Sequence, residues 1–255
     1  MLVDKFKKQK LNQQTKPKVF LGGYSLVEML ITLAIISTLL TLVGILLTTL
    51  LKTSISTEAR TTARKESEYL SAVLRINIAN ADPEKVLVFS APNREMNEDG
   101  EFINLAGVDI TAVSLDGSVA NEIHVLPLNG NKWVCIAHAY VDTIEGPRGM
   151  LLRTSASLTT IPVDSIDGAT HKKCFSPNPN PDLYTYLTYM NSSQINVNVP
   201  DINSALQFNA YSSPSGNVYV RTTIGVKPVE WIGGSRGALR PEYIRSSLVK
   251  TSLMK

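Results

Sequence analysis

The feature that most constrains this chain is an uninterrupted apolar segment near its N-terminus. Leu26 to Leu51 make 26 residues with a single charged side chain, Glu28. About 20 apolar residues are enough for a helix to cross the hydrocarbon core of a bilayer. A lone spanning segment must also satisfy its backbone hydrogen bonds internally, which a helix does. The segment therefore predicts a single transmembrane helix.

The distribution of charge predicts the orientation of that helix. The 255 residues carry a formal net charge of +3, but residues 1–23 contain six lysines and one aspartate, a net +5, which leaves −2 for the rest. By the positive-inside rule the N-terminus is cytoplasmic and residues 53–255 lie outside. A slightly acidic body argues against nucleic acid as a general partner.

A cleaved secretory signal and an uncleaved signal anchor are the alternatives for this segment. A secretory signal has an apolar stretch of about 7–15 residues that ends at a small-residue cleavage site. Here the apolar run is longer, and the small residues Gly22 and Gly23 precede it. A signal anchor accounts for the segment but not for the heptapeptide GGYSLVE at positions 22–28.

This heptapeptide resembles the prepilin processing motif of type IV pilins and pseudopilins: a glycine, an aromatic residue, a short polar–apolar stretch and a glutamate. The resemblance covers the basic leader, the motif and the apolar span. It implies that a prepilin peptidase cleaves between Gly23 and Tyr24 and N-methylates Tyr24. The two glycines, which lack side chains and disfavour helix, let the backbone lie extended in a protease cleft.

The resemblance also implies partners and a location. The protein would reside in the bacterial cytoplasmic (inner) membrane as a single-pass protein, with its outer domain periplasmic or extracellular, and then enter a pilus or pseudopilus. The partners implied are the prepilin peptidase, other pilin or pseudopilin subunits through the N-terminal helix, the inner-membrane assembly platform, and membrane lipid before assembly.

Glu28 is the residue to which we assign a role in assembly. It follows Tyr24 by four residues, about 6 Å along a helix axis. A carboxylate costs roughly 2.5–3.5 kcal/mol near the centre of a span and less near its end. The α-amine that cleavage creates at Tyr24, on the same or a neighbouring subunit, offsets that cost. The alternative is a glutamate that merely lies close to the lipid headgroups.

After Lys52 the apolar pattern becomes amphipathic. Apolar residues recur at helical spacing, at Ile55, Ala59, Ala63, Leu70, Val73 and Ile76 or Asn77. No proline occurs between Lys18 and Pro83, so a helix is predicted from Tyr24 to Asn80, with Gly44 as its one weak point. One stripe of this second half should pack against the domain that follows.

The rest of the chain predicts strands separated by turn residues. The predicted strands are Val86–Ser90, Val108–Leu115, Glu122–Leu128, Lys132–Val141, Met150–Thr154, Leu158–Val163, Leu206–Tyr211 and Val218–Val226. Asn129-Gly130 between two apolar runs predicts a hairpin, and 164–182 reads as a surface loop. The predicted fold is α+β and pilin-like: a long helix packed on an antiparallel sheet.

The predicted organisation has five parts. They are a cleaved basic leader (1–23), a transmembrane and assembly helix (24–52), an amphipathic helix (53–82), a β-rich extracytoplasmic domain (83–232) and a basic, flexible C-terminal tail (233–255).

The two cysteines, Cys135 and Cys174, both fall in the part expected outside the cytoplasm, where disulfides persist. A bond between them is favoured and would stabilise the fold by about 4 kcal/mol in the chain-entropy model. Free thiols remain open, as does a zinc site that adds His138 and His171. Against that zinc site, positions 135 and 138 of one strand point to opposite faces.

Enzyme chemistry is not expected, and neither is a metal or another cofactor. Ser235 sits in a G-x-S-x-G pattern, but no histidine follows His171 to serve as its base. His124, His138 and His171 are interpreted as structural or surface residues. The tail from Ser235 has a local net charge of +4 but lacks interleaved aromatic residues, which is weak evidence for binding to DNA.

The sequence thus favours a structural subunit, a minor pilin or pseudopilin. The alternatives are a filament-borne adhesin or DNA-uptake subunit that uses the basic tail or the 164–182 loop, and a membrane-anchored enzyme that the missing catalytic residues disfavour.

Overall fold

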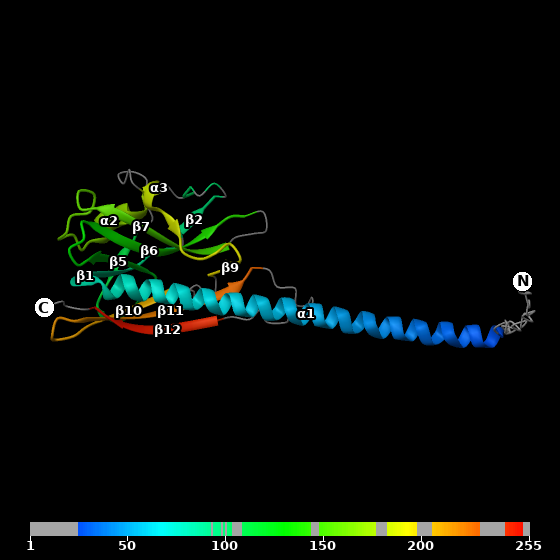
Figure 1. Ribbon diagram of the computed structural model, residues 1–255. Helices are drawn as coiled ribbons and strands as arrows, with labels where there is room; N and C mark the ends of the chain where they lie inside the picture. Colours follow the sequence, from blue (N-terminus) through cyan, green and yellow to red (C-terminus); the bar gives the residue numbers. More distant parts are fainter. Residues whose placement is uncertain are drawn as a thin grey trace, which may run out of the picture. The chain divides into compact units, whose positions relative to one another are not determined.

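The structure is a computed structural model that describes residues 25–92, 94–97, 99, 101–103, 109–143, 148–176, 183–197, 206–229 and 243–251 (Figure 1). Contacts within the chain divide it into two compact units, Met1–Leu50 and Leu51–Lys255. Each unit is described by itself.

One long helix, α1 (Leu26–Ala79), accounts for all described residues of the first unit except Ser25 and continues into the second. Its bounds agree with the predicted helix. The chain passes through Gly44 without a break, and a Cβ at that position would meet nothing within 4 Å. Gly44 is therefore neither a kink nor a close contact within this chain.

The second unit contains two β-sheets. The strands are β1 (Ala81–Ser90), β2 (Arg94–Met96), β3 (Thr111–Val113), β4 (Asp116–Ala120), β5 (Glu122–Pro127), β6 (Lys132–Val141), β7 (Arg148–Ser157), β8 (Thr188–Tyr189), β9 (Ile195–Asn196), β10 (Leu206–Ser212), β11 (Val218–Pro228) and β12 (Tyr243–Lys250). Three short helices, α2 (Gly168–His171), η1 (Lys172–Phe175) and α3 (Leu183–Tyr186), follow β7.

The seven-stranded sheet has the order β3-β1-β5-β6-β7-β8, with β2 also pairing with β6. The five-stranded sheet has the order β12-β11-β10-β4, with β9 pairing with β11. All of these pairings are antiparallel except that of β2 with β6. The fold is therefore α+β, but two sheets take the place of the single sheet predicted.

The second half of α1 lies between the two sheets (Figure 1). Its buried residues are Ala63, Ser67, Leu70, Ser71, Leu74 and Ile78, a single stripe at helical spacing. The four apolar residues among them share one core with side chains of β1, β5 and β6 and of β10, β11 and β12. The buried serine Ser71 contacts the five-stranded sheet directly, since its Oγ lies 3.3 Å from Ser247 Oγ on β12.

The stripe differs from the predicted one at its two ends. Ile55 is 37% exposed and Ile76 60% exposed, whereas Leu74 and Ile78 are fully buried. The buried face near the C-terminus of the helix therefore contains Leu74 and Ile78 rather than Ile76.

A second core covers the opposite face of the seven-stranded sheet. It contains Trp133, Cys135 and Ala137 from alternate positions of β6. Phe175 and Leu183, from the segment that follows β7, cover them. This second core holds the polar cluster described below.

Turn residues explain the outcome of two of the sequence predictions, one hairpin and one strand. Asn129, at φ 59°, closes the predicted β5–β6 hairpin. The predicted strand Leu158–Val163 is wrong, because the Ser157 carbonyl accepts the N–H groups of Thr160 and Ile161 and the chain turns there. The Ser157 hydroxyl also bonds Thr159 and Thr160, a local arrangement that competes with strand pairing.

The C-terminal tail differs from the expected flexible segment. Residues 243–250 form β12, which pairs with β11 over its full length, from Tyr243↔Val226 to Lys250↔Tyr219. The strand pairing offsets the loss of chain entropy, which charge composition alone does not predict. Residues 230–242 and 252–255 lie outside the described part of the chain.

Substitution of Leu74 by alanine should lower the free energy of unfolding by about 2–5 kcal/mol, because it leaves a cavity between the two sheets. Ile76→Ala, on the exposed side of the same helix turn, is the matched control and should change it by less than about 1 kcal/mol. Chemical unfolding of the full chain in detergent, followed by tryptophan fluorescence, measures both. Equal losses would contradict the assignment of the buried stripe.

Candidate functional site: the apolar helix surface and a buried polar cluster

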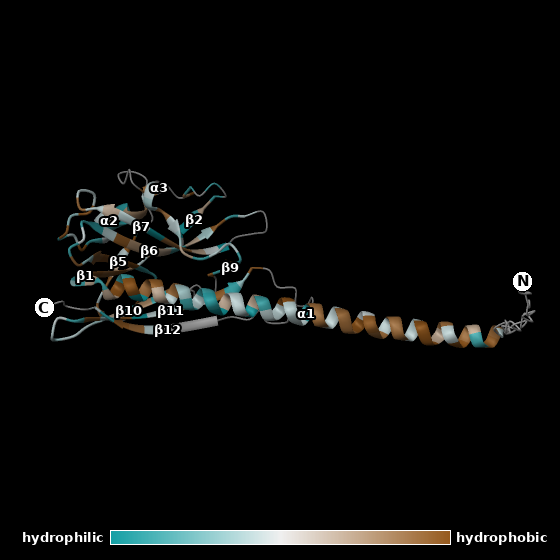
Figure 2. Ribbon diagram, viewed as in Figure 1, coloured by the Kyte–Doolittle hydropathy of each residue, from teal (hydrophilic) through white to brown (hydrophobic). Residues whose placement is uncertain are grey.

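The first candidate site is the apolar surface of α1. Between Leu26 and Leu50 the helix exposes 16 large apolar side chains, each with 50–78% of its surface accessible. Figure 2 shows the corresponding hydrophobic colour along this part of α1. Within the described part of the chain, α1 is the one helix long and apolar enough to cross a membrane.

The hydroxyl side chains of this segment form hydrogen bonds within the helix itself. Thr32 Oγ1 donates to the Glu28 carbonyl at 3.0 Å, and Thr41 Oγ1 donates to the Ser37 carbonyl at 2.8 Å. Thr38, Thr48, Thr49 and Ser37 bond backbone carbonyls three or four residues earlier in the same way. A hydroxyl bonded to its own helix adds little polarity to the outer surface, so the surface suits lipid or the apolar face of another helix.

Glu28 is the one charged side chain of the segment, and it lies in the first turn of α1. It is exposed. The first turn of a helix has unpaired backbone N–H groups and the positive end of the helix dipole, both of which favour a carboxylate. The cleavage-motif residues Gly23 and Tyr24, and with them the distance from the Tyr24 amine to Glu28, lie outside the described residues.

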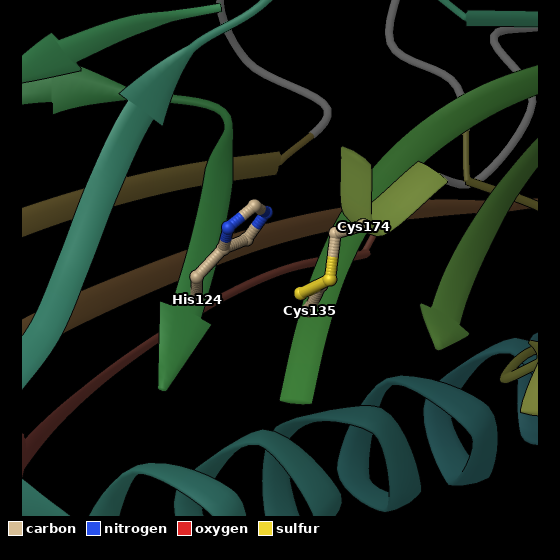
Figure 3. A group of neighbouring side chains, drawn as sticks. All are labelled: His124, Cys135 and Cys174. Atoms are coloured by element: carbon tan, nitrogen blue, oxygen red, sulfur yellow. A yellow bond between two sulfur atoms is a disulfide. The ribbon is translucent and has the colours of Figure 1, made fainter. Parts of the chain in front are cut away.

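The second candidate site surrounds the disulfide between Cys135 and Cys174, which the structure contains as predicted. The bond joins β6 to η1 over a sequence separation of 39 residues, and both cysteines are fully buried. His124 on β5 lies beside it, because the strand register pairs His124 directly with Cys135 (Figure 3).

Four charged or titratable side chains form a buried chain of contacts next to this disulfide. Arg94 Nη2 donates to Glu122 Oε2 at 2.8 Å, and Glu122 Oε1 lies 2.6 Å from His124 Nε2. His124 Nδ1 lies 2.9 Å from His171 Nδ1, and His171 Nε2 lies 3.0 Å from the Ser165 carbonyl oxygen. We call Arg94, Glu122, His124 and His171 the polar cluster; each is at most 3% exposed.

Local structure positions both histidines. Glu122 and His124 lie two residues apart on β5 and share one face of the sheet. His171 ends the short helix α2, which is capped by Asp167 through a 2.7 Å bond from the Thr170 N–H. Gly168 lets this helix approach the preceding chain, because a Cβ there would overlap the Ile110 carbonyl oxygen.

The hydrogen bonds determine how many protons the two histidines hold. Each Nε2 faces an oxygen that can only accept, so each carries a hydrogen. The two Nδ1 atoms can bond each other only if one of them also carries a hydrogen. A hydrogen bond at all four ring nitrogens of the pair therefore requires three hydrogens.

The pKa shifts in the cluster agree with this arrangement. Burial by itself would raise the pKa of Glu122, but the charge of Arg94 and the hydrogen bond from His124 outweigh it and lower the pKa to about 2. Burial, reinforced by the charge of His124, lowers the pKa of His171 to about 4. The lowered pKa favours the neutral form of His171, which can accept a hydrogen bond at Nδ1.

Aromatic rings keep the polar cluster dry. Phe89 lies 4.8 Å from the His124 ring centroid, and Trp133 meets the edge of His171 at 4.7 Å. Phe175 stacks under the Arg94 guanidinium at 4.5 Å. Arg94 Nε has no hydrogen-bond partner among the described residues, which adds to the cost of burying this charge.

The predicted zinc ligands come together only in part. His138 points to the opposite face of β6 from Cys135, as strand geometry requires, and lies 2.6 Å from the Val197 carbonyl oxygen. Burial lowers its pKa. Sequence reasoning missed His124, Glu122 and Arg94 as members of a site. The sequence signal that could have revealed the cluster was the placement of Glu122 and His124, two polar residues, at alternate positions of an apolar strand.

Several residues of interest lie outside the described part of the chain, among them Gly233–Gly237 with Ser235, and the prolines of the 164–182 loop. The described part of that loop is largely helical, and it carries His171 and Cys174 into the second core.

Comparison with known proteins adds no identification. No protein-family model, no curated protein and no solved structure matches this chain. What the fold and the sites define is a class: an α+β protein with a single long N-terminal helix, apolar enough to span a membrane, packed on antiparallel sheets and containing a disulfide.

Arg94→Met should lower the free energy of unfolding by about 3–5 kcal/mol, because it leaves the Glu122 charge buried without its partner. Arg64→Met removes the exposed pair with Glu68 and should cost about 0–1 kcal/mol. Unfolding of the full chain in detergent at neutral pH compares the two variants. A small effect in Arg94→Met would show that the Arg94–Glu122 pair does not hold the cluster.

Proposed function

We propose that this protein is a structural subunit of a type IV pilus or of a type II secretion-like pseudopilus, assembled through its N-terminal helix. The observation that carries the proposal is the combination of the GGYSLVE motif at 22–28 with an α1 surface that exposes apolar side chains on every face. A motif without such a surface, or the surface without the motif, would fit a simple anchor as well.

The apolar surface requires a cover in every state of the protein. Burial of apolar surface contributes about 25 cal/mol per Å², so residues 26–50 are stable in lipid or against other apolar helices. The internally bonded hydroxyls of Thr32, Thr38 and Thr41 leave a surface suited to both environments. The free energies of the helix in lipid and in a bundle of similar helices are then close, and a small additional interaction decides between the two environments.

Glu28 supplies that interaction in our proposal. Cleavage after Gly23 creates an α-amine at Tyr24, four residues before Glu28. A carboxylate in the first helical turn and an amine on a neighbouring subunit form a pair that is strong where water is excluded. The uncleaved chain has no amine at this position, so proteolysis controls assembly.

Size favours a minor subunit over a major one. The chain predicted after cleavage has 232 residues, and the resemblance implies that major pilins are generally smaller. The second unit then acts as a specialised head domain that primes or caps a filament.

The adhesin or DNA-uptake alternative has less support than the structural role. It relied on the basic tail and on the 164–182 loop as free binding segments. The described parts of both are ordered instead: residues 243–250 belong to a sheet, and His171 and Cys174 are buried.

Mass spectrometry of the protein from cells that express a prepilin peptidase should find an N-terminus at Tyr24 that carries a methyl group. Gly23→Val should block this cleavage, because a branched side chain fills the space that lets the glycine backbone lie close to the protease. A protein that functions with its leader intact in such cells would contradict the proposal.

Glu28→Leu should leave cleavage intact and abolish entry into filaments, because it removes the partner of the new amine. Val27→Leu, an apolar exchange at the neighbouring position, is the matched control and should be cleaved and assembled normally. The measurement is the amount of this protein in filaments. The filaments are sheared from the cell surface or, for a pseudopilus, isolated after overexpression. Normal assembly of the cleaved Glu28→Leu protein would refute the role of Glu28.

A further inference from the structure

The five-stranded sheet has two open borders, β12 on one side and β4 on the other. Within the described part of the chain, β12 pairs with β11 alone and β4 with β10 alone. β12 is the longest border strand among the described residues: it has eight residues, pairs without a register shift and lies at the outside of this sheet in Figure 1. A border strand directs one row of backbone N–H and C=O groups away from its neighbour, and a further strand can pair with that row.

The strand directions make the two borders complementary. Each neighbouring pair in the order β12-β11-β10-β4 is antiparallel, so the direction alternates and β4 runs opposite to β12. When a second copy lies beside the first in the same orientation, its β4 comes next to β12 and the two strands are antiparallel. The inner faces of the two sheets, which pack on α1, then lie on the same side. Such a head-to-tail contact leaves one border open at each end and can repeat.

A common orientation of the copies excludes the pairing of β12 with a second β12. In the proposed role, residues 26–50 of every copy enter the membrane from the same side, so the α1 helices are parallel. An antiparallel contact between two β12 strands would reverse α1, and a parallel contact would turn the inner face of one sheet outwards. Pairing of β12 with β4 keeps both the helix direction and the face of the sheet.

The register places matching residues at the ends of two rows on the outer face, the face turned away from α1. One row of directly paired residues crosses the sheet from β12 to β4: Leu248, Arg221, Asn209 and Val119. The next row on this face is Lys250, Tyr219, Tyr211 and Asp116. The first row therefore begins and ends with an apolar side chain, and the second begins and ends with opposite charges.

All four residues at the ends of these rows are exposed. Leu248 is 66% exposed and Val119 54% exposed, and Lys250 and Asp116 are exposed as well. Hydrogen bonds from Ser118 lower the pKa of Asp116, so its carboxylate is charged at neutral pH. When the sheet continues into a second copy in the same register, Leu248 lies opposite Val119. Lys250 then lies opposite Asp116, and both kinds of cross-strand pair are favourable.

A β-bulge in β4 brings Asp116 to this face. Val119 and Asp116 are three residues apart, yet they pair with residues of β10 that are two apart, Asn209 and Tyr211. Gly117, at φ 96°, provides the backbone conformation of the bulge. Without the extra residue Asp116 would lie on the inner face. The bulge also shortens the regular part of β4, so pairing at this border is weak unless α1 already holds the two copies together.

We propose that β12 of one copy of this chain pairs antiparallel with β4 of the next copy, so that their five-stranded sheets form one continuous sheet. The inference rests on the proposed function, because packing of α1 in a filament supplies the common orientation and the closeness that this short contact needs. It adds a contact between the folded units to the packing of the helices. It also requires at least two adjacent copies, so a minor subunit of this kind enters the filament in runs.

Cysteine cross-linking in filaments tests the pairing. In the full-length chain with Val119→Cys and Leu248→Cys, oxidation of isolated filaments should give covalent dimers or longer oligomers on a non-reducing gel, because directly opposed residues of an antiparallel pair lie within disulfide reach. Within one copy the two positions are three strand spacings apart, about 14 Å, which is too far for a bond. Ile166→Cys with Leu248→Cys is the matched control and should stay monomeric, since Ile166 is 68% exposed but lies outside this sheet.

The outcomes separate this contact from the filament role itself. Coexpression of the two single variants should give dimers, because each copy then offers one new sulfur. Monomers only, from filaments that contain the double variant, would overturn the inference and leave the proposed function intact. Dimers from Leu248→Cys alone would show pairing of β12 with β12 and would also overturn it. Absence of the parent chain from every filament fraction would overturn the proposed function, and this inference with it.

Exchange of the two border charges tests the register. Lys250→Glu or Asp116→Lys, each in the cysteine double variant, places like charges opposite each other and should lower the yield of oligomers about fivefold. Both exchanges together should restore the yield to within about twofold. Asp116 also accepts a hydrogen bond from Ser118 in its own turn, which Lys250→Glu does not repair, so recovery reports on the contact between copies. A combined variant with no more oligomers than either single exchange would overturn the proposed pairing.

Discussion

Burial of one stripe of α1 between two sheets is the interaction on which the rest of the outer unit depends. Leu70, Leu74 and Ile78 belong to one core with side chains of both sheets, so the inner faces of the two sheets are buried together with the helix. The opposite side of the seven-stranded sheet then becomes a second core. The polar cluster and the disulfide lie in this second core, and their geometry follows from the way the first one packs.

The same helix meets two different physical demands along its length. From Leu26 to Leu50 every residue is exposed, and most of the side chains are apolar. From Ala63 to Ile78 the helix is amphipathic, with one buried stripe. The first segment needs lipid or other helices as its cover, and the second is covered by its own chain. This division is the basis of the proposed role, because it makes one part of the helix available for intermolecular packing while the other holds the folded unit.

The polar cluster shows how an apolar core can contain charge. Arg94 and Glu122 lie at most 3% exposed, and such a pair stabilises a fold little compared with apolar residues of the same size. The pair instead fixes the orientation of the histidine rings, because the Glu122 carboxylate orients His124 and His124 orients His171. Loss of one member leaves another buried without its partner. The cluster therefore ties β2, β5 and α2 to a single arrangement around the disulfide.

Local patterns were sufficient to predict much of this fold. The helix from Leu26 to Ala79, the strand Lys132–Val141 and the hairpin at Asn129-Gly130 all follow from periodicity and turn chemistry. Strand β12 and the turn after Ser157 were not predicted, because each depends on a competition between two states of the chain. For β12, pairing with β11 competes with a disordered tail. After Ser157, local hydrogen bonds of the side chain compete with the hydrogen bonds of a strand ladder. His124 was missed as a site residue because the nearest cysteine in space belongs to another strand.

The sequence by itself determined the apolar segment, the amphipathic character of the second half of the helix, and the separation of His138 from Cys135. These properties depend on residues that are neighbours along a helix or a strand, where spacing fixes direction. Only the tertiary structure decided that there are two sheets, that β12 completes one of them, and that Arg94, Glu122, His124 and His171 meet. Those contacts depend on strand register and on layer packing, and neither is encoded in the spacing of adjacent residues.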